Sequence, residues 1–363
     1  MKILRIILIF LNVLAATALL LSYAASYISP EKIAHLAYFG FAYPALLIIN
    51  LIFILFWVFS RLKYALISLI TILLGFGILS KHVQIFGKSL PDEKANSYIH
   101  LISYNVQLFG LYNWTQNQEI RDSIINFIQS EQPDILCLQE YYTNQSGRFK
   151  TGSLITEALE DVNMHESFSV HMHGYQSYGM ASFIRYPICH TGEIQFENSN
   201  NLVQFTDFIF QKDTLRLYNI HLQSLHFDNT DYQNLDNLQV KTINKKELGK
   251  IRNIMHKFVY AAKKRVIQSD SIKYHINQSP YPVIVCGDFN DTPGSYTYNL
   301  ISKDLKDAFQ KSGKGLDLSY QRGILRMRID HILHDKSLKS YGFETKNIKY
   351  SDHFPVSCYL SAK

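Results

Sequence analysis

The sequence predicts an α/β domain in which two β-sheets pack against each other between helices, with about three membrane-spanning helices ahead of it. Three uncharged apolar runs occupy much of the first 80 residues. Beyond them, many strand-like runs and few long helical segments suit a sheet-on-sheet core better than regular alternation of strand and helix. Short polar clusters follow or interrupt several of these runs, and strand ends and loops are where functional residues gather.

The uncharged runs cover residues 6–28, 36–60 and 64–80. A helix needs about 20 apolar residues to cross the ~30 Å hydrocarbon layer of a bilayer. The first two runs meet this length, and the third, with 17 residues, is predicted to be a short span. The alternative for the first run is a cleaved signal peptide, because Lys2 and Arg5 precede it. Its apolar part is too long for one, and two further runs follow.

Basic residues indicate the orientation of these spans. Lys2 and Arg5 keep the N-terminus in the cytoplasm, and Arg61 with Lys63 forms a loop on the same side by the positive-inside rule. Three lysines after the third run argue against this orientation: Lys81, Lys88 and Lys94. We expect a multi-pass protein of the cell (inner) membrane, with its C-terminal domain on the extracytoplasmic, periplasmic side.

Composition divides the chain into a transmembrane region at 1–85, a linker at 86–97 and a C-terminal domain at 98–363. Residues 1–94 hold eight Lys/Arg against three Asp/Glu, which leaves 28 against 27 in the remainder. A nearly neutral outer domain lacks the broad basic face that usually binds nucleic acid. A basic run between Lys241 and Arg265 leaves nucleic acid open as a partner, although a solvated helix face has the same composition.

Strand-like and helical pieces alternate in the C-terminal domain. Strands are expected at 99–105, 134–139, 180–184, 205–210, 215–220, 283–286, 329–333 and 356–360, the second one ending at Glu140. A helix is predicted at 119–129 from its one-sided apolar pattern, and a longer one at 244–267.

The four cysteines are Cys137, Cys189, Cys286 and Cys358. They lack metal-binding spacing and are expected to be buried free thiols, although an extracytoplasmic location would permit disulfides.

The polar clusters carry the candidate chemistry: SYNVQ, LQE, NIHLQS, GDFND, and RIDHIL with SDHFPV. Cleavage of a phosphate ester needs a cation to neutralise charge, a base to orient water and donors to the transition-state oxygens. Carboxylates such as Glu140, Asp288 and Asp352 suit a hard cation such as Mg²⁺ better than a zinc site of His and Cys. The clusters therefore predict one metal-dependent, phosphate-cleaving site.

From about residue 99 to residue 360 the chain resembles the endonuclease/exonuclease/phosphatase family, because six motifs occur in the order that this family has. The family includes deoxyribonucleases, abasic-site endonucleases, neutral sphingomyelinases and inositol-polyphosphate phosphatases. The resemblance implies a four-layer α/β sandwich and hydrolysis of a phosphate ester with Mg²⁺ or Mn²⁺. It makes residues 98–363 the catalytic domain of a membrane-anchored, bacterial-type member.

Carried over position by position, the resemblance implies three residues at the metal. Asn105 in SYNVQ matches an asparagine near the ion, Glu140 in LQE matches the main metal-binding glutamate, and Asp352 in SDHFPV matches a second carboxylate on that side.

The resemblance also implies five catalytic residues. His221 matches the histidine that contacts the phosphate, and Asp288 with Asn290 matches the pair that orients the attacking water and holds the phosphate. Asp330 would orient His353, the last histidine, by fixing its tautomer. The implied mechanism is a single in-line attack by water without a covalent enzyme intermediate.

Neighbouring residues are expected to support the site more than to react. They are Tyr175, Tyr178 and Tyr186 for packing, Arg265 and Gln268 as a buttress of the strand that carries Asp288, and His331 and His334 as substrate-side or structural residues.

The sequence leaves the substrate open. A lipid or a small phosphoester is the first expectation, and an extracytoplasmic endonuclease or exonuclease is the alternative. A third class, a catalytically silent binding module, is disfavoured because Glu140, Asp288 and His353 are all present. The Asp/Asn-rich insert at 226–237 is neither a hydrophobic loop nor a basic groove, so it favours neither substrate. No oligomeric state is indicated.

Overall fold

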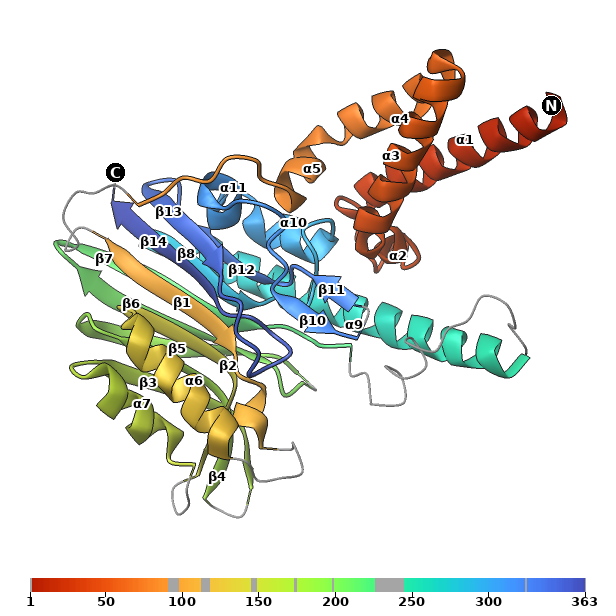
Figure 1. Cartoon of the computed structure of the whole chain (residues 1–363). Helices are drawn as coiled ribbons and strands as arrows, with labels where there is room; N and C mark the ends of the chain where they lie inside the picture. The colour runs from red at the N-terminus through yellow and green to blue at the C-terminus, as the bar shows by residue number, and fades with distance from the viewer. Residues whose placement is uncertain are drawn as a thin grey trace.

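The structure is a computed structural model that describes residues 2–90, 98–111, 118–144, 149–172, 175–197, 199–225, 245–323 and 325–362. Within these residues, an N-terminal group of helices projects from an α/β domain built on two six-stranded sheets (Figure 1). The insert expected at 226–237 and most of the expected linker, from residue 91 on, lie outside the described residues.

Among the described residues, two helices are long and apolar enough to cross a membrane, α1 (Lys2–Ala25) and α3 (Tyr43–Ser60). The short helix α2 (Leu36–Phe41) lies between them in the chain. Helices α4 (Leu62–Leu74) and α5 (Phe76–His82) pass the same test only as a pair, with a bend of 70° between them. The third expected span is therefore bent at Gly75, where a Cβ would lie 2.0 Å from the ring of Tyr23.

The helical group carries apolar side chains outside and polar side chains inside. Phe59 is 85% exposed and Ile3 is 76% exposed, whereas Asn12, Asn50 and Ser68 are fully buried. The Ser68 hydroxyl lies 2.6 Å from Asn12 Oδ1 and 2.8 Å from Asn50 Oδ1, so one residue from each of α1, α3 and α4 joins the same network. Hydrogen bonds between small polar side chains inside an apolar exterior are typical of helices that face lipid.

The first sheet has the strand order β13-β14-β1-β2-β4-β3 and the second has the order β5-β6-β7-β8-β12-β9. The first comprises β1 (Ile99–Asn105), β2 (Ile135–Asn144), β3 (Asn163–Met172), β4 (Gln176–Ile184), β13 (Leu338–Thr345) and β14 (Val356–Ala362). The second comprises β5 (Ile188–Gln195), β6 (Leu202–Phe210), β7 (Asp213–His221), β8 (Val283–Asp288), β9 (Lys306–Asp307) and β12 (Asp330–His334). The pairs β1–β2 and β7–β8 are parallel. A separate hairpin is formed by β10 (Tyr320–Arg322) and β11 (Leu325–Met327).

The sheets pack face to face between helices, which gives the four layers expected of an α/β sandwich. Leu101 of β1 joins the apolar layer between the sheets, whereas its neighbour Ile102 packs with Ile124 on the outer side. Side chains that alternate between the two faces of a strand produce this division. Helices α6 (Gln118–Glu131) and α7 (Thr151–Leu159) cover the first sheet, and α9 (Lys245–Asn277) and α10 (Tyr296–Ser302) cover the second.

Most of the expected elements are present, with some differences in extent. The prediction that the second strand ends at Glu140 is wrong, because β2 continues to Asn144 after a shift in register. Helix α9 runs ten residues beyond the predicted end at 267 and finishes at Asn277. Strands β3, β5 and β13 and helices α7, α10 and the short α11 (Ala308–Ser312) were not expected.

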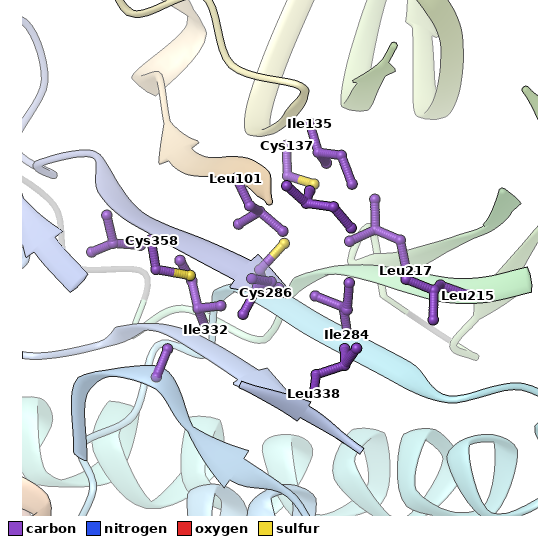
Figure 2. Packing of buried hydrophobic residues seen from close by; sticks show 14 of the residues in the cluster. Leu101, Ile135, Cys137, Leu215, Leu217, Ile284, Cys286, Ile332, Leu338 and Cys358 are labelled. Atoms are coloured by element: carbon purple, nitrogen blue, oxygen red, sulfur yellow. The ribbon is translucent and has the colours of Figure 1, made fainter. Parts of the chain in front are cut away.

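All four cysteines lie in the described residues and are free thiols. Cys137, Cys286 and Cys358 are buried in the layer between the sheets, where Figure 2 shows them among Leu101, Ile332 and other apolar side chains. Burial is confirmed for these three, whereas Cys189 is exposed.

The end of α5 is hydrogen-bonded to the α/β domain. Lys81 O accepts from Arg328 Nη1 at 3.0 Å, and Lys81 Nζ donates to Asn299 Oδ1 at 3.1 Å. A little further along, the amide of Lys88 donates to Ser312 O at 3.1 Å. The described start of the expected linker is therefore attached to the domain.

We predict that Arg328→Met destabilises the protein strongly. The guanidinium is buried and lies 2.7 Å from Asp307 and 2.8 Å from Asp317, so its loss leaves two buried carboxylates without their cation. Removing one partner of a buried ion pair costs about 3–5 kcal/mol, which should lower Tm by roughly 10 °C. The measurement is thermal unfolding of the full chain in detergent, with the exposed Arg326→Met as the control; equal Tm values for the two variants would contradict this role.

Candidate active site

Three of the predicted catalytic residues lie in a row across the second sheet. His221 ends β7 and Asp288 ends β8, and the parallel register pairs these two residues. Asp330 begins β12, and the antiparallel register pairs it with Asp288 from the other side. Strand pairing alone therefore brings together residues that are far apart in the sequence.

The first sheet contributes Asn105 and Glu140 at the same end of the sandwich. Asn105 ends β1, and its Nδ2 donates to Glu140 Oε1 at 3.2 Å and to Asp288 Oδ2 at 3.0 Å. Glu140 lies at the register shift in β2 and has a φ of 47°, in the left-handed region. A residue in this conformation at an irregularity re-aims its side chain, as β-bulges near active sites do. One amide therefore joins the carboxylates of the two sheets.

His221 faces both of these carboxylates. Its Nε2 lies 3.8 Å from Glu140 Oε1 and 3.9 Å from Asp288 Oδ2. These distances are longer than direct hydrogen bonds. Since the Glu140 side chain is 34% exposed, the space in front of the three groups opens to solvent.

Asn290 fixes the turn that follows Asp288. Its amide donates to Asp288 Oδ1 at 2.7 Å, and its side-chain Nδ2 donates to Leu222 O at 2.9 Å. Like Glu140, it has a positive φ, of 51°, which asparagine tolerates better than most residues. The turn is thereby tied both to the carboxylate and to the segment after His221.

Asp330 and His353 form a buried pair next to Asp288. His353 Nδ1 lies 2.9 Å from Asp330 Oδ2, and its other ring nitrogen, Nε2, lies 3.6 Å from Asp288 Oδ2. The hydrogen bond to Asp330 sets the orientation of the ring and aims Nε2 at the site.

Burial and neighbouring charges raise the pKa values of both Asp288 and His353. Burial raises the pKa of Asp288 from 3.8 to about 6, against the opposing effect of the His353 charge. Burial lowers the pKa of His353, but the negative charges of Asp330 and Asp288 outweigh it and hold that pKa well above its usual range. Near neutral pH the site therefore combines an ionised Asp288, poised as a base, with a cationic His353.

A cavity of about 230 Å³ lies over this group. Of the residues predicted from the sequence, it is lined by Glu140, Asp288, Asn290, Asp352 and His353. His221 lines a larger neighbouring cavity of about 480 Å³, which shares Glu140 with the first. Asn105 and Asp330 are buried behind the lining residues. The structure thus brings all eight predicted residues to one place.

The cavity also has lining residues that the sequence did not suggest. Arg322 of the β10–β11 hairpin lies 3.6 Å from Asp352 Oδ2 and offers a guanidinium to a phosphate. Gln107, Tyr320, Phe41 and Phe258 line it too. Pairing places this hairpin beside the cavity, because Tyr320 forms a β-bridge with His353.

The donor set fits a hard divalent cation. Glu140, Asp288 and Asp352 offer carboxylate oxygens around the cavity, the ligand type that Mg²⁺ prefers. The Asn105 carboxamide lies beside them, with its Nδ2 toward Glu140 and Asp288 and its Oδ1 accepting from the Gln107 amide. Two carboxylates held within 3.2 Å of one amide nitrogen also favour a positive charge nearby. Ligand atoms of Asp288, Asp330 and His353 form a second compact group, within 4.8 Å of one another. In that group, His353 Nδ1 is engaged with Asp330.

The neighbouring residues contact backbone and core. Arg265 Nε donates to Asp291 Oδ2 at 3.1 Å, next to the Asn290 turn, and Gln268 accepts from the amide of Gln223 at 2.9 Å. His331 packs between aromatic rings, and burial lowers its pKa to about 3. Arg265 thus supports the turn after the strand that carries Asp288, as expected, whereas Gln268 supports the segment after His221.

Comparisons with known proteins support the fold. No curated protein matches the chain. Residues 5–82 match a domain family of unknown function.

Solved structures of similar fold cover the α/β domain. A humanized D. rerio TDP2 has 16% identity and a TM-score of 0.53, covering 73% of this chain and 100% of that one. The human nocturnin catalytic domain with bound sulfate has 18% identity and a TM-score of 0.52, covering 74% and 95%. A Bacteroides thetaiotaomicron protein of the endonuclease/exonuclease/phosphatase family has 16% identity and a TM-score of 0.51, covering 73% and 95%.

The sequence profile that matches the α/β domain agrees with these structures. It is that of the Endonuclease/Exonuclease/phosphatase family, it extends over residues 102–353, and it contains every residue of the row across the second sheet. The match covers more than half of the chain, and the chain belongs to the endonuclease/exonuclease/phosphatase family.

Proposed function

We propose that this protein is a membrane-anchored, metal-dependent hydrolase of phosphate esters, acting on a lipid or a small phosphoester outside the cytoplasm. The observation that carries the proposal is the convergence of two carboxylates and two histidines from both sheets on one open cavity. Glu140, Asp288 and His353 line that cavity together, with His221 within 4 Å of both carboxylates.

The helical group supports the membrane part of the proposal. Its apolar exterior and polar interior suit a lipid environment, in which hydrogen bonds must be satisfied inside the bundle. Asn12 of α1 takes part in that network, which favours a resident helix over a cleaved leader. Lys2 and Arg5 lie at the free end of α1, and Arg61 lies between α3 and α4. The positive-inside rule then assigns this end to the cytoplasm and the α/β domain to the periplasm.

In the proposed reaction a water molecule attacks phosphorus opposite the leaving oxygen. Asp288 orients this water and accepts its proton, since the carboxylate is buried and has a raised pKa. His353, held by Asp330, and His221 donate hydrogen bonds to phosphate oxygens as charge develops on them. Asn290 positions the phosphate, and Arg322 adds a further positive charge at the cavity.

A divalent cation such as Mg²⁺ or Mn²⁺, held by Glu140 with Asn105 and Asp352, would neutralise charge on the phosphate.

The activity should fall as the pH is lowered. Asp288 acts as a base only when ionised, and its pKa is raised to about 6 in the folded protein. We therefore expect kcat/KM for bis(4-nitrophenyl) phosphate to decrease about tenfold per pH unit below that value at saturating Mg²⁺. A bound cation would move this limb to lower pH without changing its sign. A profile in which kcat/KM rises between pH 7 and pH 5 would contradict the assignment.

Loss of either catalytic group should lower turnover without unfolding the domain. We expect Asp288→Asn and His353→Ala each to reduce kcat by roughly 10²–10⁴. The matched control is Asp213→Asn, an exposed carboxylate at the start of β7. A near-normal kcat in either purified site variant, with a circular dichroism spectrum like that of the wild type, would contradict the role given to that residue.

The metal and the substrate class can be tested in one experiment. We expect the full chain in detergent to hydrolyse bis(4-nitrophenyl) phosphate with Mg²⁺. A chelator should abolish this hydrolysis, and excess Mg²⁺ should restore it. Glu140→Gln should need more Mg²⁺ for the same rate. The wild type should nick supercoiled plasmid no faster than His353→Ala does. Chelator-sensitive nicking by the wild type that is lost in His353→Ala would instead establish the nuclease alternative.

A further inference from the structure

The cavity over the catalytic residues is partly walled by the membrane-helix region. Phe41, the last residue of α2, lines it together with Phe258 of α9. The two rings meet edge to face, with centroids 5.1 Å apart. A residue from the segment between two candidate membrane spans therefore borders the same space as Asp288 and His353.

Helix α2 is held in this place by polar and aromatic contacts. Tyr38 Oη donates to Met255 O of α9 at 2.9 Å, and the Tyr38 ring lies 5.3 Å from that of Phe258. Burial of Phe258, at 7% exposure, shows that these rings cover it closely. The position of Phe41 is thus fixed by the rings of Tyr38 and Phe258 and by a hydrogen bond.

The same segment touches the catalytic turn. Ser26 Oγ donates to Gly294 O at 2.8 Å, four residues after Asn290. Gly40 approaches the same carbonyl so closely that a Cβ on Gly40 would lie 2.9 Å from it. The α1–α3 connection and the turn that carries Asn290 therefore pack as one unit.

The lining of the cavity combines two chemically different sets of residues, which we call the charged side and the apolar side. The charged side is formed by Glu140, Asp288, Asp352, His353 and Arg322. The apolar side is formed by Phe41, Leu225, Phe258, Leu325, Met327 and Ile329. A substrate that matches both sides has a phosphate joined to an apolar group.

Two residues of the apolar side, Phe41 and Phe258, lie where the helical group meets the domain. Helices α1 and α3 both reach α2 with their domain-side ends (Figure 1), and Phe41 is the last residue of α2. Tyr27 and Ile33, in the same connection, are exposed. The segment that borders the cavity therefore lies at the domain-side ends of the two candidate spans.

We propose that Phe41 and Phe258 form a chain-binding wall that selects a membrane-resident phosphoester with a long aliphatic tail. The tail lies against the apolar side while its phosphate reaches the charged side. The membrane region then acts as part of the substrate site in addition to being an anchor. This inference rests on the proposed phosphoesterase function and adds the substrate class to it.

The test compares two esters that share one reacting group. Methyl 4-nitrophenyl phosphate and hexadecyl 4-nitrophenyl phosphate both release nitrophenolate, and they differ only in the tail. With the full chain in neutral lipid vesicles and Mg²⁺, Phe41→Ala should lower the ratio of kcat/KM for the hexadecyl ester over the methyl ester about tenfold, through KM. Phe41→Leu should restore most of the ratio, because it keeps apolar area.

Phe86→Ala is the matched control. Phe86 is 87% exposed, follows α5 and does not line the cavity, so its loss tests for changes in vesicle partitioning alone. The ratio of kcat/KM for the hexadecyl ester over the methyl ester should be the same in Phe86→Ala as in the wild type. An unchanged ratio in Phe41→Ala, or an equal fall in Phe86→Ala, would overturn the chain-binding wall.

A second measurement does not depend on the activity of the variant. A hexadecyl phosphonate with a diazirine near its head group should label peptides of α2 and α9 in the wild-type protein. Labelling confined to α1, α3 and α4 would contradict the proposal. If the wild type releases no nitrophenolate from the methyl ester with any metal, the phosphoesterase function itself fails, a result distinct from an unchanged ratio.

Discussion

The site depends on how the two sheets are fixed against each other. Asn105 joins their ends by donating to a carboxylate from each, and deeper in the sandwich Gln139 Nε2 donates to Asn219 Oδ1 at 2.7 Å. Both of these deeper amides are fully buried. A shift of one sheet would break this bond and those from Asn219 Nδ2 to the carbonyls of Leu138 and Ala181 in the first sheet, at a cost of about 1–3 kcal/mol for each group left unpaired. The distance between Glu140 and the residues of the second sheet is therefore set by the fold.

Within the second sheet, a close approach of two strands also fixes the positions of site residues. Gly287 has a φ of 135°, and a Cβ there would lie 2.0 Å from Ile220 O. Only glycine allows β8 to run this close to β7 immediately before Asp288. The consequence is that His221 and Asp288, which follow the contact on each strand, lie side by side, with 3.9 Å between His221 Nε2 and Asp288 Oδ2. Burial at the same point raises the pKa of Asp288.

The family resemblance carried by the polar motifs predicted which eight residues come together, and several of them, such as Asn105, His221 and Asp288, end strands with clear apolar periodicity. The edge strands β3 and β5 were missed since most of their side chains are exposed or half-buried and show little apolar signal. The bulge at Glu140 arises from pairing of β2 with β4 beyond the site, a long-range effect. Phe41 and Arg322 lie outside the motifs, and only tertiary contacts bring them to the cavity.

The cavity keeps a fixed position relative to the N-terminal helical group because several contacts connect them. Arg328 binds Asp307 and Asp317 and also donates to the carbonyl of Lys81, so α5 is joined to the strand that begins with Asp330. On the other side, Ser26 holds the turn after Asn290. A domain attached at both of these points cannot rotate freely on its anchor. The position of the cavity relative to α2 and α5 is therefore a property of the folded chain.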